Sequence, residues 1–242
     1  MGVIARGRID GDAGFAAEWL FTDRVGGVSA GEYAALNVGA SVGDDPGAVA
    51  ANRRAIAGYV GADALALVRQ VHGRDVARLT APADVPPEAD AIITEVADLP
   101  IAVQTADCVP ILIADLARGQ VAAVHAGWRG VVADVVGAAL DELAAPGPVH
   151  AWIGPAICPA CYEVSEEVRD EVAAIAPAAY SRTRTGTPAV DVRAGVAQQL
   201  LAHGISAQLV GGCTFESEDL FSFRRDPVTG RQAGVIVLRE RS

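Results

Sequence analysis

Three short segments of the sequence concentrate residues that can bind a metal ion or move a proton. They read Gln70-Val71-His72-Gly73, Thr105-Ala106-Asp107-Cys108 and His125-Ala126-Gly127-Trp128-Arg129-Gly130. Each lies at the end of an apolar run typical of a strand, where α/β proteins usually carry functional groups. On a strand, Gln70 and His72 would share one face, because side chains alternate with a period of two. We expect the fold to bring the three segments together.

The side chains of His72, Cys108 and His125 suit a zinc ion. Zn²⁺ binds imidazole nitrogen and thiolate sulfur, and three protein ligands leave the fourth position open for water or substrate, as in catalytic sites. Two other interpretations stay open on spacing alone. The histidines could be hydrogen-bonded core groups, or Cys108 and His125 could form the nucleophile and base of a cysteine hydrolase.

The supply of soft ligands argues against copper chemistry. The chain has four Cys, four His and one Met, and that Met is Met1. A blue copper centre uses a weak axial Met, and a multicopper oxidase needs several more imidazoles. Zn²⁺ is therefore favoured over Cu²⁺, and a copper polyphenol oxidase is the disfavoured alternative. Cys158 and Cys161 are interpreted as two incidental thiols, with a thioredoxin-like redox pair as the disfavoured alternative, because the helix that such a motif should open is expected only near Ser165. Cys213 is interpreted as a buried small residue.

Composition narrows the class of protein further. Of the 242 residues 51% are hydrophobic, and the formal net charge is −11. This profile predicts a globular chain and argues against nucleic-acid or anionic-membrane binding. All 19 basic residues are Arg, which excludes a catalytic Lys and a Walker A loop. The sequence shows no secretory leader and no long apolar run, so a cytoplasmic protein with reduced cysteines is expected.

Strand-like and helix-like segments alternate along the chain and predict one domain over residues 1–242, built as a mixed α/β sandwich. Short apolar or alternating runs bounded by Gly, Pro or Asp predict the following strands: Phe15–Phe21, Ala66–Val71, Ile101–Thr105, Pro110–Ala114, Val121–Val124, His150–Ile153, Ala207–Val210 and Gly234–Leu238.

Capping signals predict three helices. The first has Asp45 as N-cap and Pro46 at its first position and ends at Gly61; the second follows Gly127 to about Leu143; the third runs from the cap Asp191 to Gly204. Asn52 and Arg53 fall on or beside the apolar stripe of the first helix. They are either a polar pair directed into a site or, for Arg53, a long side chain that reaches solvent at the helix edge.

The ordered set of motifs closely resembles the YfiH-like, laccase-domain family, over nearly the whole chain. The markers are Thr22–Ser29 with Leu36-Asn37, the three segments above, Ala89-Asp90-Ala91, Ile153-Gly154-Pro155 with Tyr162-Glu163-Val164, and Phe221–Arg225 with Thr229-Gly230-Arg231. Members of this family are described as zinc-dependent purine nucleoside phosphorylases and adenosine deaminases. The resemblance implies zinc ligation by His72, Cys108 and His125, and a four-layer αββα sandwich of the α+β class with mixed sheets.

For the activity that the resemblance implies, we expect phosphate to attack the anomeric carbon of adenosine, inosine or S-methyl-5'-thioadenosine. Arg53 and Arg129 are the candidates for phosphate, because guanidinium groups match oxyanions. Asn37 and Gln70 are candidates for hydrogen bonds to the nucleoside, and Asp107 for acid/base catalysis or ligand orientation. A deaminase would need an unusual acid/base group, because no Glu follows His125. A non-catalytic zinc-binding module is a further alternative.

Overall fold

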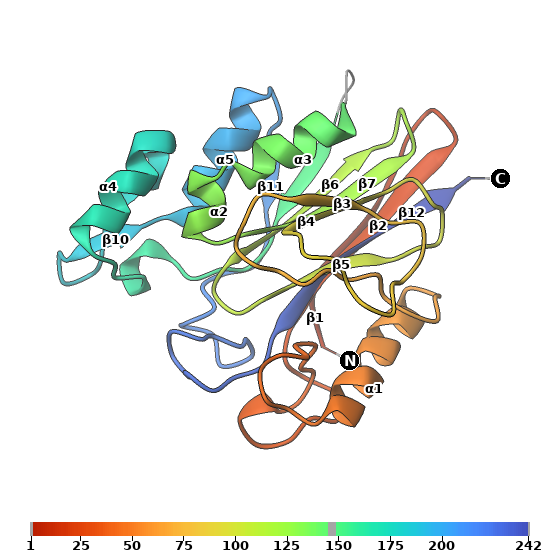
Figure 1. Ribbon diagram of the computed structural model, residues 1–242, viewed down its shortest axis with the longest axis horizontal. Helices are drawn as coiled ribbons and strands as arrows, with labels where there is room; N and C mark the ends of the chain where they lie inside the picture. The colour runs from red at the N-terminus through yellow and green to blue at the C-terminus, as the bar shows by residue number, and fades with distance from the viewer. Residues whose placement is uncertain (1, 145–148, 242) are drawn as a thin grey trace.

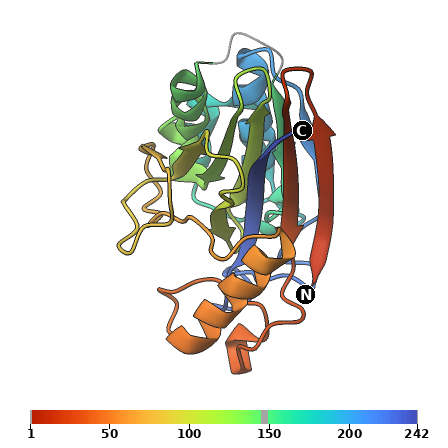
Figure 2. The same cartoon turned by 90° about the vertical axis from the view of Figure 1, so that its right-hand side faces the viewer.

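Two β-sheets packed face to face form the centre of the protein, and helices cover both outer faces (Figures 1 and 2). The computed structural model describes residues 2–144 and 149–241. Helix α1 lies on one side of the sheets, and α2, α3, α4 and α5 lie on the other. This order of layers is the αββα sandwich with mixed sheets that the family resemblance predicts.

The smaller sheet has four strands in the order β1-β2-β12-β5, and each pair is antiparallel. The strands are β1 (Val3–Asp10), β2 (Phe15–Thr22), β5 (Ile101–Thr105) and β12 (Gln232–Glu240), and the covering helix is α1 (Pro46–Tyr59). Leu20 and Val235 of the sheet pack with Ile56 of α1 in one buried cluster. Asp45 caps α1 by accepting the Ala48 N–H at 2.8 Å, so this helix begins where its N-cap signal predicts.

The larger sheet has six strands in the order β11-β8-β6-β7-β4-β3. Its outer strand pairs, β11 with β8 and β3 with β4, are parallel, and the inner pairs are antiparallel. The strands are β3 (Val76–Arg78), β4 (Ala91–Thr94), β6 (Val109–Asp115), β7 (Gln120–Ala126), β8 (His150–Ile153) and β11 (Ala207–Leu209).

The outer face of the larger sheet is covered by α2 (Trp128–Val132), α3 (Val135–Leu143) and α5 (Val192–Ala202), and α4 (Glu166–Ile175) packs against α2 beyond the edge of the sheet (Figure 1). The remaining elements are the short ribbon of β9 (Tyr180–Arg182) and β10 (Pro188–Val190), and the 3-10 turns η1 (Gly31–Tyr33), η2 (Pro159–Cys161) and η3 (Pro177–Ala179). Within residues 2–144 and 149–241, no helix has the length and apolar character to cross a membrane.

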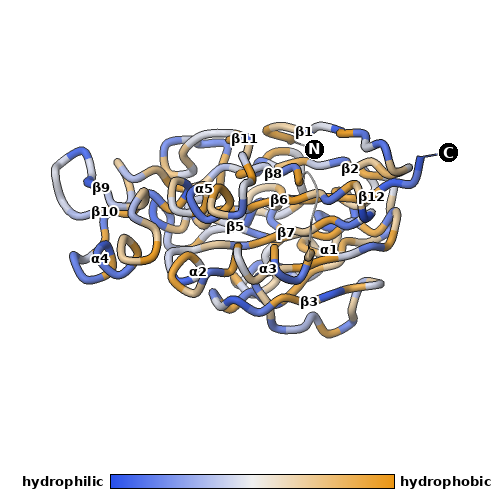
Figure 3. Tube along the Cα trace, turned by 90° about the horizontal axis from the view of Figure 1, so that it is seen from above, coloured by the Kyte–Doolittle hydropathy of each residue, from blue (hydrophilic) through white to orange (hydrophobic). Residues whose placement is uncertain are grey.

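Aromatic and branched side chains fill the space between the two sheets. Trp19 of β2 packs on Trp152 of β8 with ring centroids 5.1 Å apart, and Leu112 and Ile236 are fully buried beside them. The central strands accordingly carry most of the hydrophobic residues, and polar residues gather at the loops and ends (Figure 3). This double core makes the sheets a rigid platform, because apolar surface is buried on both faces of the larger sheet.

Seven of the eight predicted strands are present within a few residues of their expected bounds. The exception is 66–71, which makes only the isolated bridges Ala66 to Ile101 and Arg69 to Glu88. The predicted helix 128–143 is broken in two, because Asp134 adopts a left-handed conformation (φ +57°) and caps α3. Within the described residues, five strands are present that the sequence did not predict, and each is short or lies at a sheet edge: β1, β3, β4, β9 and β10.

Candidate metal centre

Four adjacent strands of the larger sheet, β6, β7, β4 and β3, bring the candidate ligands to one end of that sheet. Cys108 directly precedes β6, and the β6–β7 register pairs Pro110 with His125. Asp90 directly precedes β4, and its carbonyl accepts the backbone N–H of His125 at 2.7 Å. His72 lies in the turn before β3. The three candidate metal ligands, far apart in sequence, therefore meet because their strands are neighbours.

His72, Cys108 and His125 form a compact group. Their ligand atoms all lie within 4.8 Å of one another. The Cys108 sulfur lies 3.8 Å from Nε2 of His72, and the two imidazole rings meet edge to face with centroids 4.8 Å apart. His125 is buried and His72 is exposed. The group therefore has a closed side in the sheet and a side open to solvent.

Asp90 orients both histidines, a role that sequence reasoning did not assign to it. Its fully buried carboxylate accepts Nδ1–H of His125 at 2.8 Å and the backbone N–H groups of Val71, His72 and Gly73 at 3.2, 3.0 and 2.6 Å. These bonds hold His72 in a left-handed conformation (φ +62°), which is uncommon for residues other than Gly. The prediction that Gln70 and His72 share a strand face is therefore wrong: a turn clamped by a carboxylate sets the direction of His72.

The electrostatics of the group favour a thiolate. Burial opposes ionisation of Cys108, but the neighbouring His125 and His72 outweigh it and lower the pKa of the thiol to about 6. Burial likewise disfavours the imidazolium of His125, but Cys108 and Asp90 raise its pKa to about 9. Hydrogen bonds from His125 and from backbone N–H groups outweigh burial and lower the pKa of Asp90. A metal ion would take the place of the proton shared between Cys108 and His125.

Gly127 leaves the space that a metal centre needs. A Cβ atom at this position would lie 3.0 Å from the Cys108 sulfur and 3.1 Å from Cδ2 of His72, closer than side-chain atoms normally pack. Two imidazole nitrogens and one thiolate form a donor set typical of open metal sites. The residues present therefore fit a metal ion held by His72, Cys108 and His125, with Asp90 orienting the two histidines.

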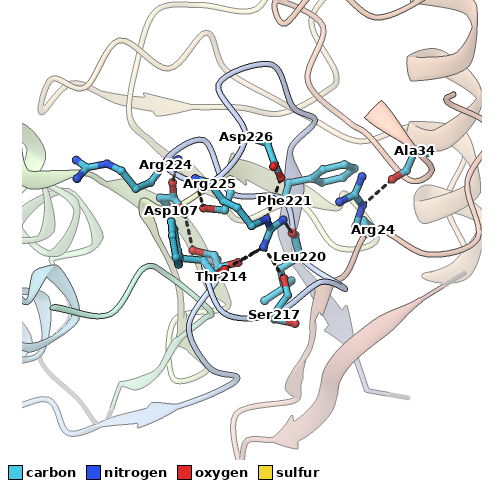
Figure 4. Close-up of polar contacts among 12 residues, drawn as sticks. Arg24, Ala34, Asp107, Thr214, Ser217, Leu220, Phe221, Arg224, Arg225 and Asp226 are labelled. Atoms are coloured by element: carbon cyan, nitrogen blue, oxygen red, sulfur yellow. Dashed lines mark hydrogen bonds and ion pairs between the residues drawn. The ribbon is translucent and has the colours of Figure 1, made fainter. Parts of the chain in front are cut away.

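Asp107, next to Cys108, is held by the protein on both carboxylate oxygens. Oδ1 accepts the Thr214 hydroxyl at 2.6 Å and Oδ2 accepts the Arg224 backbone N–H at 2.6 Å (Figure 4). Its backbone is left-handed (φ +90°) and its side chain is buried. These contacts favour a positioning role, in which Asp107 fixes the turn that carries Cys108.

The two amides predicted to bind substrate form hydrogen bonds within the protein. Gln70 exchanges two bonds with the backbone of Gln104 in β5, at 2.8 and 2.9 Å. Asn37 is fully buried; its oxygen accepts the N–H groups of Gly39 and Arg231, and its nitrogen donates to Asp44. Both side chains therefore tie loops to the sheets, and their contact with a nucleoside stays a prediction.

The two arginines predicted to bind phosphate lie in different places. Arg53 is half-buried on α1, where Nε donates to the Val38 carbonyl at 2.9 Å, and no hydrogen bond among the described residues joins it to the metal ligands. Arg129 is exposed and stacks on Trp128 at 4.4 Å, two residues after Gly127. Helix α2 has only five residues. Its dipole therefore stabilises an anion at its N-terminus less than the dipole of the predicted 128–143 helix would.

Three further side chains, Tyr162, Arg224 and Arg231, lie near the ligands and were not predicted from the sequence as site residues. Burial raises the pKa of Tyr162 to about 12, with Cys108 adding to the rise and Arg224 opposing it. Burial lowers the pKa of Arg231, whereas Cys108 and Asp107 act in the opposite direction. Tyr162 and Arg231 therefore lie close enough to Cys108 to interact with its charge, and the Arg224 backbone N–H contacts Asp107, the residue before Cys108. All three belong to segments that carry the family resemblance, so their motifs were visible but their function was not.

One internal arginine shapes the loop that presents Arg224. Arg225 donates to the carbonyls of Thr214, Ser217 and Leu220 at 3.0, 2.8 and 2.6 Å and pairs with Asp226 at 2.9 Å (Figure 4). Because one guanidinium satisfies several carbonyls, the loop is held without regular secondary structure. Arg224 itself stacks on Tyr162 at 4.8 Å.

Fold and site together define an αββα protein with an open centre of two histidines and one cysteine. Residues 18–239 match the family described as "Multi-copper polyphenol oxidoreductase laccase". A purine nucleoside phosphorylase of Streptomyces coelicolor is 52% identical over 92% of this chain and 96% of its own. The purine nucleoside phosphorylase YfiH of Escherichia coli is 40% identical over 89% and 91%. The chain belongs to this laccase-domain family.

A solved structure supports the same assignment. The crystal structure of YlmD from Geobacillus stearothermophilus is 32% identical to this chain, covers 96% of it and 98% of its own chain, and superposes with a TM-score of 0.84. The family description mentions copper, but the other two histidines lie elsewhere. His150 stacks near Trp152 in β8, and His203 ends α5. The protein thus lacks the imidazoles of a multicopper centre.

Proposed function

We propose that the protein is a zinc-dependent purine nucleoside phosphorylase. It would convert adenosine, inosine or S-methyl-5'-thioadenosine and phosphate into the free base and a pentose 1-phosphate. The observation that carries the proposal is the open His72, Cys108 and His125 group with Arg231 and Arg224 beside it. The likeness to relatives named purine nucleoside phosphorylase supports the substrate class.

The guanidinium groups around the ligands suit inorganic phosphate. Arg231 is electrostatically coupled to Cys108, and Arg129 and Arg224 both act on Tyr162. Arginine forks match phosphate oxygens in a bidentate manner, and a partly buried guanidinium loses less of the interaction to solvent. Within this arrangement Arg129 and Arg231 would hold phosphate, and Arg53 would support the backbone of Arg231 through Val38, whose N–H donates to the Arg231 carbonyl at 3.1 Å.

Two aromatic side chains near the arginines, Phe223 and Tyr162, suit the purine. Phe223 is 55% exposed, and Arg231 lies over its ring at 5.8 Å. An exposed ring of this kind can stack on a base. The Tyr162 hydroxyl keeps its proton at neutral pH because its pKa is about 12, so it can donate a hydrogen bond to the departing base. A bound zinc ion would supply Lewis-acid polarisation of a substrate oxygen or nitrogen.

Adenosine deamination is the proposed side activity, and it requires water in place of phosphate. Asp107 is the nearest carboxylate in sequence to Cys108, but its two oxygens are held by Thr214 and Arg224. Deamination is therefore expected to be slower than phosphorolysis, because zinc deaminases use a carboxylate that moves protons and Asp107 is fixed by these contacts.

The test is incubation of zinc-loaded protein with adenosine, with and without phosphate, followed by chromatography of adenine, ribose 1-phosphate and inosine. We expect adenine and ribose 1-phosphate only when phosphate is present, and a smaller amount of inosine in both arms. Cys108→Ala is the control. Product at or below the level of that control would refute the proposal.

A cysteine hydrolase is the second candidate, and the low pKa of Cys108 beside His125 is the observation that favours it. The two proposals differ in their metal content. A hydrolase would be isolated without stoichiometric zinc and would react with iodoacetamide whether or not zinc is added. A zinc-bound thiolate would react only after chelation. A non-catalytic zinc module would bind the metal and form no nucleoside product.

A further inference from the structure

A second group of thiols lies away from the ligands described above. Cys158 directly precedes η2, Cys161 is the last residue of η2, and Cys213 lies in the loop after β11. Their sulfur atoms all lie within 4.8 Å of one another. All four cysteines of the chain lie in its described part and none is in a disulfide. The interpretation of Cys213 as a buried core residue is wrong, because it is half-buried and belongs to this group.

Backbone pairing holds the two segments together. Ala156 and Cys213 form an isolated parallel bridge, and the Thr214 N–H donates to the Ala156 carbonyl at 3.2 Å. The Cys158 N–H donates to the Cys213 sulfur at 3.2 Å. A backbone donor directed at a sulfur stabilises negative charge there. The convergence of the thiols is thus built by main-chain contacts.

The spacing and number of the thiols distinguish a metal site from a redox pair. Cys158 and Cys161 have the C-x-x-C spacing that is typical of structural zinc sites, and Pro159 fixes the turn between them. A redox pair needs two sulfurs, whereas a third thiol converging on the same point supplies another ligand. Glu216 lies on the same side, with Oε1 3.7 Å from the Cys161 sulfur.

The surroundings suit a cation that enters from solvent. A cavity of about 400 Å³ opens beside Cys213, and its lining includes the carboxylates of Asp23, Glu216 and Asp219. Arg184 pairs with Glu216 and is the basic group that faces this carboxylate. Carboxylates around the mouth of a cavity raise the local concentration of cations.

We propose that Cys158, Cys161 and Cys213 form a second metal site that binds one thiophilic divalent cation, Zn²⁺, in a structural role. The fourth ligand is Glu216 or water. This site is separate from the group of His72, Cys108 and His125 and does not depend on the proposed activity.

The second site has a structural consequence for the first. The Ile157 N–H donates to the Asp107 carbonyl at 3.0 Å, and the Thr214 hydroxyl donates to the Asp107 carboxylate at 2.6 Å. Ile157 and Thr214 are each adjacent in sequence to a proposed ligand, Cys158 and Cys213. A metal ion joining these segments therefore fixes the turn that carries Cys108.

The experiment titrates metal-free, fully reduced protein with Co²⁺ and records the thiolate-to-cobalt charge-transfer absorption. We expect two Co²⁺ per chain in the unaltered protein. Cys108→Ser should keep one Co²⁺ with the intense absorption of several thiolates. Cys213→Ser should lose that band and keep the weaker band of the Cys108 site. One Co²⁺ per chain, with none left in Cys108→Ser, would overturn the proposal.

A second measurement uses the unaltered protein and so does not depend on the folding of a variant. Cysteines are alkylated with iodoacetamide with and without saturating Zn²⁺, and each peptide is quantified by mass spectrometry. We expect Zn²⁺ to protect Cys158, Cys161 and Cys213 as well as Cys108. Protection of Cys108 alone, or a disulfide between two of the three thiols in protein that takes up one metal ion, would overturn the second site.

Discussion

Replacement of Asp90 by asparagine should weaken metal binding while leaving the fold intact. The carboxylate accepts hydrogen bonds from Nδ1 of His125 and from three consecutive backbone N–H groups around His72. Asparagine has nearly the same shape but keeps only one acceptor oxygen. Its NH2 group would face either the N–H groups of Val71 and Gly73, or both the imidazole and the His72 N–H. The turn that directs His72 therefore loses hydrogen bonds in either orientation.

The size of the effect follows from the lost interactions. Hydrogen bonds to a charged group contribute about 1.5–3 kcal/mol each, and partners that orient metal ligands are typically worth ten- to hundredfold in affinity. We therefore expect the Kd for Zn²⁺ to rise by about ten- to hundredfold, which is about 1.4–2.8 kcal/mol. Competition with a chromophoric chelator measures this Kd, and circular dichroism of the metal-free protein measures the fold.

Asp115→Asn is the matched control for Asp90→Asn. Asp115 is also fully buried and caps a turn by accepting the N–H groups of Ala117 and Arg118 at 3.1 and 3.2 Å. It lies at the end of β6 opposite Cys108. We expect Asp115→Asn to lower stability without changing the Kd for Zn²⁺. Wild-type zinc affinity in folded Asp90→Asn, or equal losses in both variants, would refute the role assigned to Asp90.

Three further predictions follow from the same site. Gly127→Ala should weaken zinc binding in a calorimetric titration, because its Cβ would lie 3.0 Å from the Cys108 sulfur. The control Gly58→Ala meets open space in α1 and should raise stability by about 0.5–1 kcal/mol. Equal zinc affinities of the two variants would contradict the steric argument. In metal-free protein the alkylation rate of Cys108 should rise with pH to a plateau with its midpoint near pH 6, because the thiolate predominates above its pKa. Zinc should abolish the reaction. A midpoint near the ordinary thiol value of about 8.5 would exclude the coupling to His125. Arg129→Gln should raise the KM for phosphate about tenfold or more with little change in the KM for the nucleoside, while the exposed Arg54→Gln on α1 should change neither; unchanged phosphate kinetics would remove Arg129 from the site.

Local signals predicted much of the secondary structure. Asp45 and Asp191 cap α1 and α5 as expected, with bonds of 2.8 and 3.0 Å to the N–H groups three residues on. These features depend on a few adjacent residues, so they can be seen in a sequence. The strand β1 was missed because charged residues alternate with small ones at a sheet edge. The break at Asp134 was missed because the apolar period of the helix continues across it.

Residue types alone narrowed the chemistry of this protein. The absence of Lys excluded a catalytic Lys, the small number of His and the single Met disfavoured a multicopper centre, and the motif order indicated the family. The family model and the relatives confirm that assignment.

How these residues meet depends on the three-dimensional fold. It placed Asp90 between both histidines, turned Asn37 and Gln70 toward the protein, and joined Cys213 to Cys158 and Cys161. These arrangements come from the order β6-β7-β4-β3 and from contacts between segments that are distant in the chain. Composition and spacing fix which atoms can bind, but strand order and packing fix which of them share one point in space.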